Sequence, residues 1–196
     1  MNNYCGTSRI AGCQFTLYPM SDQFIEIILS ALEEVDTSKV WKDTDDVTTC
    51  IRGKMVHIFD VTKAIFLHAA KTGEHVAMSG TFSIGCPGDS DADVYMDETD
   101  TPLNEEKSRE IMQQAGCKFS LYPLGREDYM DVIYEQIDLS RHRNVEVSST
   151  HYATRLDGDV HHIFGALHEA FDSVQEKVSH VTMTFSISAN SPTNKE

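Results

Sequence analysis

The sequence predicts an α+β protein made of two tandem βαββαβ units, each an antiparallel four-stranded sheet with helices on one face. The stretch AGCQFTLYP at Ala11 recurs as AGCKFSLYP at Ala115, with seven of nine positions identical. The stretch HIFDVTKAIF likewise recurs as HIFGALHEAF. Strand-type and helix-type spacings of apolar residues follow in the same order in both copies, which indicates a duplicated fold.

The first copy begins with a strand and a helix. From Cys13 to Tyr18, apolar and polar residues alternate with a period of two, which predicts a half-buried strand that ends at Pro19. The next apolar residues recur at spacings of three and four. This pattern predicts an amphipathic helix from Ser21, a residue type that caps helices, to about Val35.

A hairpin, a second helix and a last strand complete the first copy. Residues 39–42 and 47–52 are rich in β-forming types and flank the Asp-containing turn 43–46. A helix with one apolar face follows Gly53, and strand-type alternation returns at 75–84.

The second copy repeats this order of elements. Its predicted elements are the strand 117–122, a helix from about Glu127 to Leu139, the hairpin 144–156, the helix 160–177 and the strand 180–188. A βαββαβ unit is the ferredoxin-like arrangement, in which two helices cover one face of the sheet. We therefore expect a first ferredoxin-like repeat at 1–88, an acidic, solvated linker at 89–112 and a second repeat at 113–196.

The sheet face that the helices leave uncovered is expected to carry the ligand-binding residues. Strand alternation places on it Gln14, Thr16, Tyr18, Ser79, Thr81 and Ser83 in the first repeat, and Lys118, Ser120, Tyr122, Thr184 and Ser186 in the second. Antiparallel sheets often have one solvated face, but Lys and Glu are scarce at these positions. Short hydroxyl side chains beside Tyr suit an interface between sheets or a pocket for a small polar ligand, and both interpretations stay open.

Three more candidates lie on or next to the third strand of a repeat. Thr49 and Thr154 each precede by four residues the glycine that opens the second helix, and His151 has no histidine counterpart in the first copy. The TFSI stretches at 81–84 and 184–187 are matched as equivalent positions. Charged residues differ around this shared framework, so one site per repeat, with unequal affinities, is expected.

Composition narrows the possible partners. The formal net charge is −15, with 31 acidic against 16 basic residues, which argues against binding nucleic acid or an anionic membrane surface. The five cysteines form no CxxC pair and no apolar run is long enough to cross a bilayer, so a reduced, cytoplasmic protein without membrane insertion is expected. Since no nucleotide-binding, nucleophile-elbow or metal-ligand motif is present, we expect no catalytic residue, no metal and no cofactor.

Several longer stretches resemble one known family. CGTSRIAGCQFTLYPM, TSKVWKDTD, the block from IFLHAA to GTFSIGCPGD, HYATRLDGDVHHIF and SANSP are similar to the YkoF family of thiamin- and hydroxymethylpyrimidine-binding proteins, over Cys5 to Pro192. The resemblance implies tandem ferredoxin-like, ACT-related repeats that form a homodimer and bind thiamin or its hydroxymethylpyrimidine moiety as a ligand, without catalysis. It also implies association with an ABC transporter in salvage of the thiamin precursor. A cationic, planar ligand agrees with the acidic charge and with the hydroxyl-rich face.

Two other functions are compatible with these residues. A small dimeric enzyme of ferredoxin-like fold would need a His or an acid in the sheet pocket, and His151 is the evident candidate. An ACT-like regulatory or structural dimer module would bind another small molecule. Thermal stabilisation by thiamin would favour the thiamin-binding function, and pH-dependent turnover of a substrate would favour the enzyme.

Overall fold

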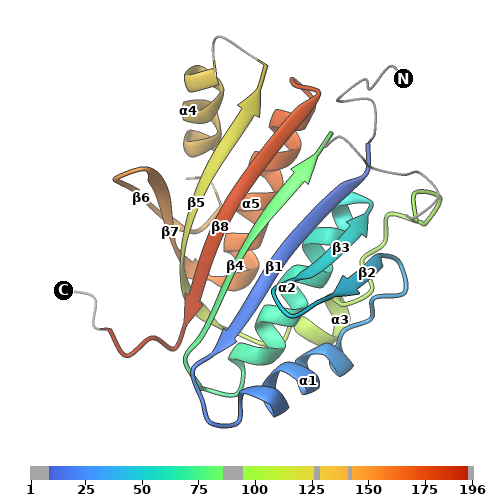
Figure 1. Ribbon diagram of the computed structural model, residues 1–196. Helices are drawn as coiled ribbons and strands as arrows, with labels where there is room; N and C mark the ends of the chain where they lie inside the picture. The colour runs from blue at the N-terminus through green and yellow to red at the C-terminus, as the bar shows by residue number, and fades with distance from the viewer. Residues whose placement is uncertain (1–8, 86–94, 126–128, 141–142, 194–196) are drawn as a thin grey trace.

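The computed structural model describes residues 9–85, 95–125, 129–140 and 143–193 (Figure 1). Its strands are β1 (Ala11–Pro19), β2 (Trp41–Thr44), β3 (Thr49–Gly53), β4 (Val76–Ile84), β5 (Gln114–Leu124), β6 (Glu146–Thr150), β7 (Ala153–Asp159) and β8 (His180–Ala189). Its helices are α1 (Phe24–Glu34), α2 (Met55–Ala70), α3 (Glu105–Ser108), α4 (Tyr129–Ser140) and α5 (Val160–Gln175). Both copies hold the predicted elements in the predicted order, and α3 is an addition. The predicted helix start at Glu127 and the linker residues 89–94 lie outside the described residues.

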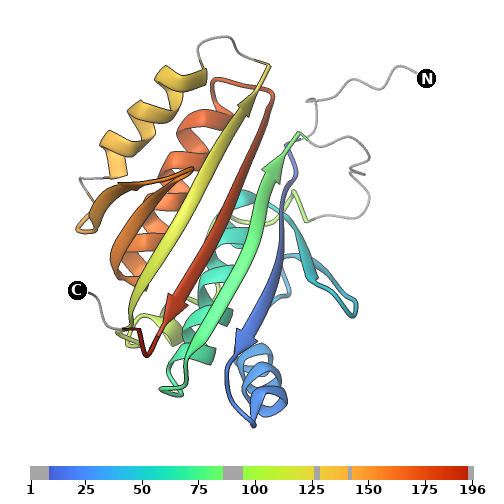
Figure 2. The same ribbon diagram turned by 60° about the vertical axis from the view of Figure 1, so that its left-hand side comes forward.

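All eight strands form one antiparallel sheet in the order β2-β3-β1-β4-β8-β5-β7-β6. Within each copy the first strand lies between the third and the fourth, which is the ferredoxin-like order. The copies join where β4 pairs with β8, so Figures 1 and 2 show a continuous twisted sheet whose halves are related by an approximate two-fold rotation. The predicted fold class, tandem ferredoxin-like (ACT-like) α+β repeats with helices on one face, is confirmed.

The strand ladders correct one match between the copies. Phe15 pairs with Gly80, whereas its counterpart Phe119 pairs with Phe185, so Gly80 and Phe185 are structural counterparts. The expected match of the two TFSI stretches is therefore wrong by two residues. A slip of two residues keeps every side chain on the same face of the sheet, which is why strand alternation did not reveal it. The counterparts in the ladders are Thr81 with Ser186, and Ser79 with Thr184.

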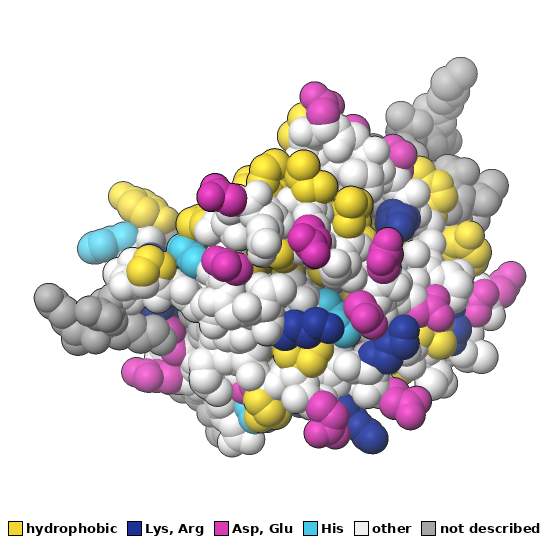
Figure 3. All heavy atoms as spheres, turned by 90° about the horizontal axis from the view of Figure 1, so that it is seen from below, with side chains coloured by type: hydrophobic (Ala, Val, Ile, Leu, Met, Phe, Trp, Pro, Cys, Tyr) yellow, Lys and Arg dark blue, Asp and Glu magenta, His cyan; other side chains and the backbone are white. Residues whose placement is uncertain are grey.

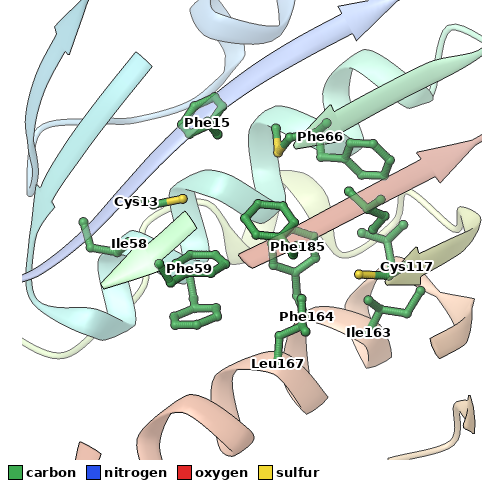
Figure 4. Close-up of a cluster of buried hydrophobic side chains, with 14 of the residues drawn as sticks. Cys13, Phe15, Ile58, Phe59, Phe66, Cys117, Ile163, Phe164, Leu167 and Phe185 are labelled. Carbon is green, nitrogen blue, oxygen red and sulfur yellow. The ribbon is translucent and has the colours of Figure 1, made fainter. Parts of the chain in front are cut away.

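The hydrophobic core is shared by the two copies. Helices α2 and α5 cover the same face of the sheet, with α1 packed against α2 and α4 against α5 (Figure 1). The ring of Phe82 on β4 stacks on Phe59 of α2, with centroids 4.1 Å apart, and on Phe185 of β8, with centroids 4.9 Å apart. Figure 4 shows Phe59, Phe164 and Phe185 in one buried cluster. Packing across the β4–β8 junction therefore joins the repeats into one body.

The described part of the predicted linker packs against the first repeat and is not simply solvated. Asn104 is 1% exposed, and its Nδ2 donates hydrogen bonds to the backbone oxygen of Asp36 (3.0 Å) and to Oδ2 of Asp60 (2.9 Å). Lys54 Nζ lies 3.0 Å from a carboxylate oxygen of Asp100. Composition indicated solvation because the segment is acidic, but a buried carboxylate on α2 needs donors, and this segment supplies them.

Candidate functional site

Each repeat has a cleft where its first strand extends beyond its third. The β1–β3 ladder ends at the pair Phe15 and Thr49, although β1 continues beside β4 as far as Pro19. The β5–β7 ladder ends at Phe119 and Thr154, although β5 continues beside β8 as far as Leu124. The outer backbone edges of 16–19 and 120–124 therefore lie outside these ladders. Such an edge can offer N–H and C=O groups to a ligand.

A hydroxyl on the first strand holds the hairpin turn beside each cleft. Thr16 Oγ1 donates a hydrogen bond to the backbone oxygen of Val47 (2.9 Å). Ser120 Oγ, its counterpart, donates to the backbone oxygen of Tyr152 (2.8 Å). Two predicted site residues thus position the turns that border the clefts.

The cleft of the second repeat has a volume of about 700 Å³ and lies between α4, the end of β5 and the β6–β7 hairpin. Its lining includes the aromatic side chains Phe119, Tyr122, Tyr134 and Tyr152, the hydroxyls Ser120, Ser149, Thr150 and Thr154, and the aliphatic side chains Ile133 and Ile137 of α4. Tyr152 is 98% exposed and its φ is 66°, in the left-handed region that non-glycine residues rarely adopt. The tight turn thus presents an aromatic ring to solvent at the edge of this cleft.

The cleft of the first repeat is smaller, about 200 Å³, and carries carboxylates in place of the tyrosines. Ile28 and Leu32 of α1 line it, 105 residues before Ile133 and Ile137, together with Asp45 and Asp46 of the hairpin loop. Hydrogen bonds from the backbone N–H groups of Thr48 and Val47 lower the pKa of Asp45 below its ordinary value, so this carboxylate stays charged at neutral pH.

The surface beside the first cleft is apolar and acidic. Phe24, Ile25 and Leu29 of α1 are each about half exposed. Figure 3 views the end of the molecule where α1 lies and shows Asp and Glu side chains spread among exposed hydrophobic ones. Lys and Arg side chains lie among them, so this end carries charges of both signs (Figure 3).

The uncovered face of the sheet has a further hollow of about 310 Å³ in the first repeat. Gln14, Thr81, Ser83 and the guanidinium-bearing Arg52, which lies 5.7 Å from the Trp41 ring centre, are placed around it. The second repeat has an ion pair at the corresponding place. Arg155 Nε and Nη2 donate to the two carboxylate oxygens of Asp157 at 2.6 and 2.8 Å, and Asp157 raises the pKa of Arg155.

The hydroxyls of β4 and β8 form one strip along the junction of the repeats. Ser79 and Ser186 share a hydrogen bond of 2.9 Å, and Ser83 lies 3.4 Å from Thr182. Thr81 pairs directly with Thr184 in the ladder. The hydroxyls that strand alternation assigns to two repeats therefore lie side by side, because β4 and β8 contribute to the same strip.

The structure distributes the sequence-predicted residues over three places. Five of them line the two clefts: Thr16, Thr49, Ser120, Tyr122 and Thr154. Three line the open-face hollow: Gln14, Thr81 and Ser83. The other six line none of these three hollows: Tyr18, Ser79, Lys118, His151, Thr184 and Ser186. Thr49 and Thr154 do not lie on the uncovered face. They pair with Phe15 and Phe119, and directly paired residues point to the same face, which here is the face covered by the helices.

Sequence reasoning missed the aromatic and aliphatic walls of the clefts. Tyr134, Tyr152 and Ile133 were not candidates, since each reads as an ordinary helix or turn residue. The predicted strands 13–18 and 47–52 are equally long and gave no signal of the cleft, whereas β1 has nine residues in the structure and β3 has five.

Within the part of the chain that the structure describes, no three His, Cys, Asp or Glu side chains gather in a way that could hold a metal ion. None of the described helices is long and apolar enough to cross a membrane.

Comparison with known proteins places the chain in a family. The family described as "YKOF-related Family" matches residues 10–89 and 114–194, one match for each repeat. A Bacillus subtilis (strain 168) protein named "Putative HMP/thiamine-binding protein YkoF" is 48% identical over 195 residues, which cover 100% of this chain and 98% of that protein.

Two solved structures align with less than half of the chain. Protein MJ1052 of Methanocaldococcus jannascii is 24% identical, covers 43% of this chain and 87% of its own, and gives a TM-score of 0.39. A domain of unknown function, DUF77, from Bacillus cereus is 19% identical, covers 39% of this chain and 75% of its own, and gives a TM-score of 0.36. With both repeats matched and a full-length relative nearly half identical, the chain belongs to the YKOF-related family.

Proposed function

We propose that the protein binds thiamin or its hydroxymethylpyrimidine moiety without catalysis, with one site in the cleft of each repeat and the tighter site in the second. The observation that carries this proposal is the duplicated cleft at the free ends of β1 and β5. The name of the 48% identical relative supports the choice of ligand.

The second cleft suits a pyrimidine ring. Its volume of about 700 Å³ lies within the range of about 300–1,000 Å³ that is usual for small-molecule pockets. Tyr122, Tyr134 and Tyr152 supply faces for stacking and for cation–π contact with the thiamin cation. The aminopyrimidine has N–H donors and ring-nitrogen acceptors, and the backbone edge of 120–124 with the hydroxyls of Ser149 and Thr154 can satisfy both.

The first cleft offers less contact area and more negative charge. Its volume of about 200 Å³ is below the usual range for ligand pockets. Asp45 and Asp46 would attract a cation but leave fewer apolar surfaces for a ring. We therefore place the weaker site there. The predicted open-face residues that line neither cleft take a different role in this proposal, at a contact between two copies of the chain.

The proposed assembly is a homodimer through the uncovered sheet face. The strip of Ser and Thr hydroxyls, with the half-exposed Tyr18, can pair with the same strip on a second copy. We further propose a cytoplasmic location and a role in salvage of the thiamin precursor together with an ABC transporter. Free, buried thiols at Cys13 and Cys117 fit a reducing compartment.

Titration calorimetry on the full chain tests the binding proposal. Thiamin and hydroxymethylpyrimidine are expected to bind with measurable heat and to raise the melting temperature as their concentration rises, because they bind only the folded state. Free amino acids serve as controls, since an ACT-like module would favour them. The proposal would be overturned if neither thiamin nor hydroxymethylpyrimidine binds, or if the protein converts thiamin on incubation.

A further inference from the structure

A second kind of hollow lies between α2 and α5, on the approximate two-fold axis that relates the repeats. It has a volume of about 200 Å³, and α3 with the segment before it forms one wall. Its lining consists of structural counterparts, each pair separated by 105 residues: Val56 and His161, Asp60 and Gly165, and Lys63 and His168. Phe59 and Phe164 form a further pair (Figure 4). The two repeats therefore contribute equivalent positions to the hollow, but the polar side chains at these positions differ.

Two buried polar atoms in this hollow have no hydrogen-bond partner among the described residues. Asp60 is 5% exposed, and its Oδ2 accepts hydrogen bonds from Asn104 N (3.0 Å), Asn104 Nδ2 (2.9 Å) and Leu103 N (3.2 Å). Its other oxygen, Oδ1, has none, and neither has Nε2 of His161. Buried polar atoms are nearly always paired, so these two atoms point to a partner that binds in the hollow.

Gly165 keeps the hollow open. It lies inside α5, where glycine makes a helix less stable than alanine does. A Cβ built at Gly165 would meet no atom within 4 Å, so neighbouring side chains do not require a glycine. The backbone does not require it either, since Gly165 is not among the described glycines with positive φ. Gly165 and Asp60 line the same hollow, so the missing side chain leaves space within it.

We propose that this hollow binds a small organic cation that carries N–H donors, a primary ammonium or an amidinium. Asp60 Oδ1 accepts one N–H, and Nε2 of His161 accepts a second. Phe164 supplies aromatic surface, which attracts cations, whereas the Phe59 ring is already stacked on Phe82 and His168. Lys63 is paired with Glu105 at 2.9 Å, and no ion pair joins Asp60 to a Lys or Arg among the described residues.

Size restricts the ligand to a compact molecule. The hollow of about 200 Å³ equals roughly six or seven water volumes of about 30 Å³ each. It shares no lining residue with either cleft, so this site is separate from them and does not depend on the proposed function.

Ethylammonium and acetamidinium chlorides are suitable probes. Titrated into the full chain at constant pH and ionic strength, they are expected to shift the ring-proton resonances of His161 and to reach saturation. A His161→Gln variant identifies those resonances. Tetramethylammonium has the same charge but no N–H donor, and it is expected to give no saturable shift. No saturable shift with either probe, or an equal shift with tetramethylammonium, would overturn the proposal.

Variants of the lining give a second readout. Gly165→Val fills the hollow, and Asp60→Asn removes the charge while keeping an oxygen for Asn104. Each is expected to weaken binding about tenfold or more, the effect of losing one charge-assisted hydrogen bond. Ser173→Ala, on the same helix and outside the hollow, is the matched control and should leave affinity unchanged. If Gly165→Val does not fold, Gly165→Ala replaces it. Unchanged affinity in a folded Gly165 variant and in Asp60→Asn contradicts the site.

Discussion

Gly80 lies directly opposite Phe185 in the β4–β8 ladder, and these two residues are also counterparts of each other in the two repeats. The approximate two-fold axis therefore passes between them. A Cβ at Gly80 would lie 2.9 Å from Cε1 of Phe185 and 2.8 Å from the backbone oxygen of Gln14. Only one of the two repeats can place a large side chain on the axis, so the symmetry must be broken at this point.

Replacing Gly80 with Ala is expected to lower the free energy of unfolding by about 1–3 kcal/mol, because the new methyl group overpacks a site bordered by backbone. Gly165→Ala is the matched control. It adds the same atom in open space within a helix and is expected to raise the free energy of unfolding by about 0.5–1 kcal/mol. Urea denaturation of both variants measures the difference, and equal effects would show that packing at the axis is not tight.

Sequence periodicity predicted the elements well because strand and helix spacings are local properties. It predicted the uncovered face for the same reason, since alternation places Gln14 and Thr16 on the side opposite Phe15. Register between distant strands is not local, and a slip of two residues leaves the alternation unchanged, so the TFSI match misled. The clefts depend on where β3 ends beside β1 and on how α4 packs. The buried contact of Asn104 with Asp60 likewise depends on tertiary packing that composition does not encode.

Filling one cleft with a larger side chain should abolish thiamin binding in that cleft and leave the other cleft unaffected. Ile133→Trp in the second repeat is expected to remove the tighter thiamin site and spare the weaker one, because the indole occupies the cleft. Ile28→Trp, the counterpart change in the first repeat, should do the reverse. Loss of a whole contact surface corresponds to at least about a tenfold change in affinity, which calorimetry resolves. A single isotherm that responds to neither change would refute one site per cleft.

Ligand charge should affect affinity in the direction set by the protein's net charge of −15. Thiamin is expected to bind more tightly than thiamin diphosphate, whose phosphates would meet the carboxylates of Asp45 and Asp46 at the first cleft. Added salt should narrow the difference, since it screens charges beyond about 8–10 Å. Calorimetry at low and high salt measures this, and tighter binding of the diphosphate would require a basic subsite instead.

The proposed dimer should dissociate when a charge is placed on the uncovered strip. Thr184→Arg adds a cation on the central strand β8, where two copies would have to bury both guanidinium groups, and a monomer is expected by sedimentation velocity at micromolar concentration. Ser30→Arg, on the exposed side of α1, is the matched control and should leave the dimer intact. A monomeric unmodified chain, or a dimer that tolerates Thr184→Arg, would exclude this face as the interface.

Stability should fall as the solution becomes mildly acidic, and His168 should be one cause. Burial lowers the pKa of His168 below its ordinary value of 6.5, with Asp172 acting in the opposite direction and Arg143 and Lys63 adding to the decrease. The unfolded chain therefore binds this proton more readily than the folded chain. The free energy of unfolding is unaffected above about pH 6.5 and decreases as the pH falls from there through the lower pKa of the folded state.

His168→Phe tests this dependence without removing the aromatic ring that stacks on Phe59 at 4.6 Å. The variant is expected to show a shallower loss of stability between about pH 6.5 and pH 5 in urea denaturation. Burial also lowers the pKa of His68, so a residual slope should remain and should decrease further in the double variant with His68→Phe. Ser173→Ala carries no titrating group and should reproduce the slope of the unmodified chain. An unchanged slope in His168→Phe would mean that this imidazole is protonated equally in both states, against the burial that the structure shows.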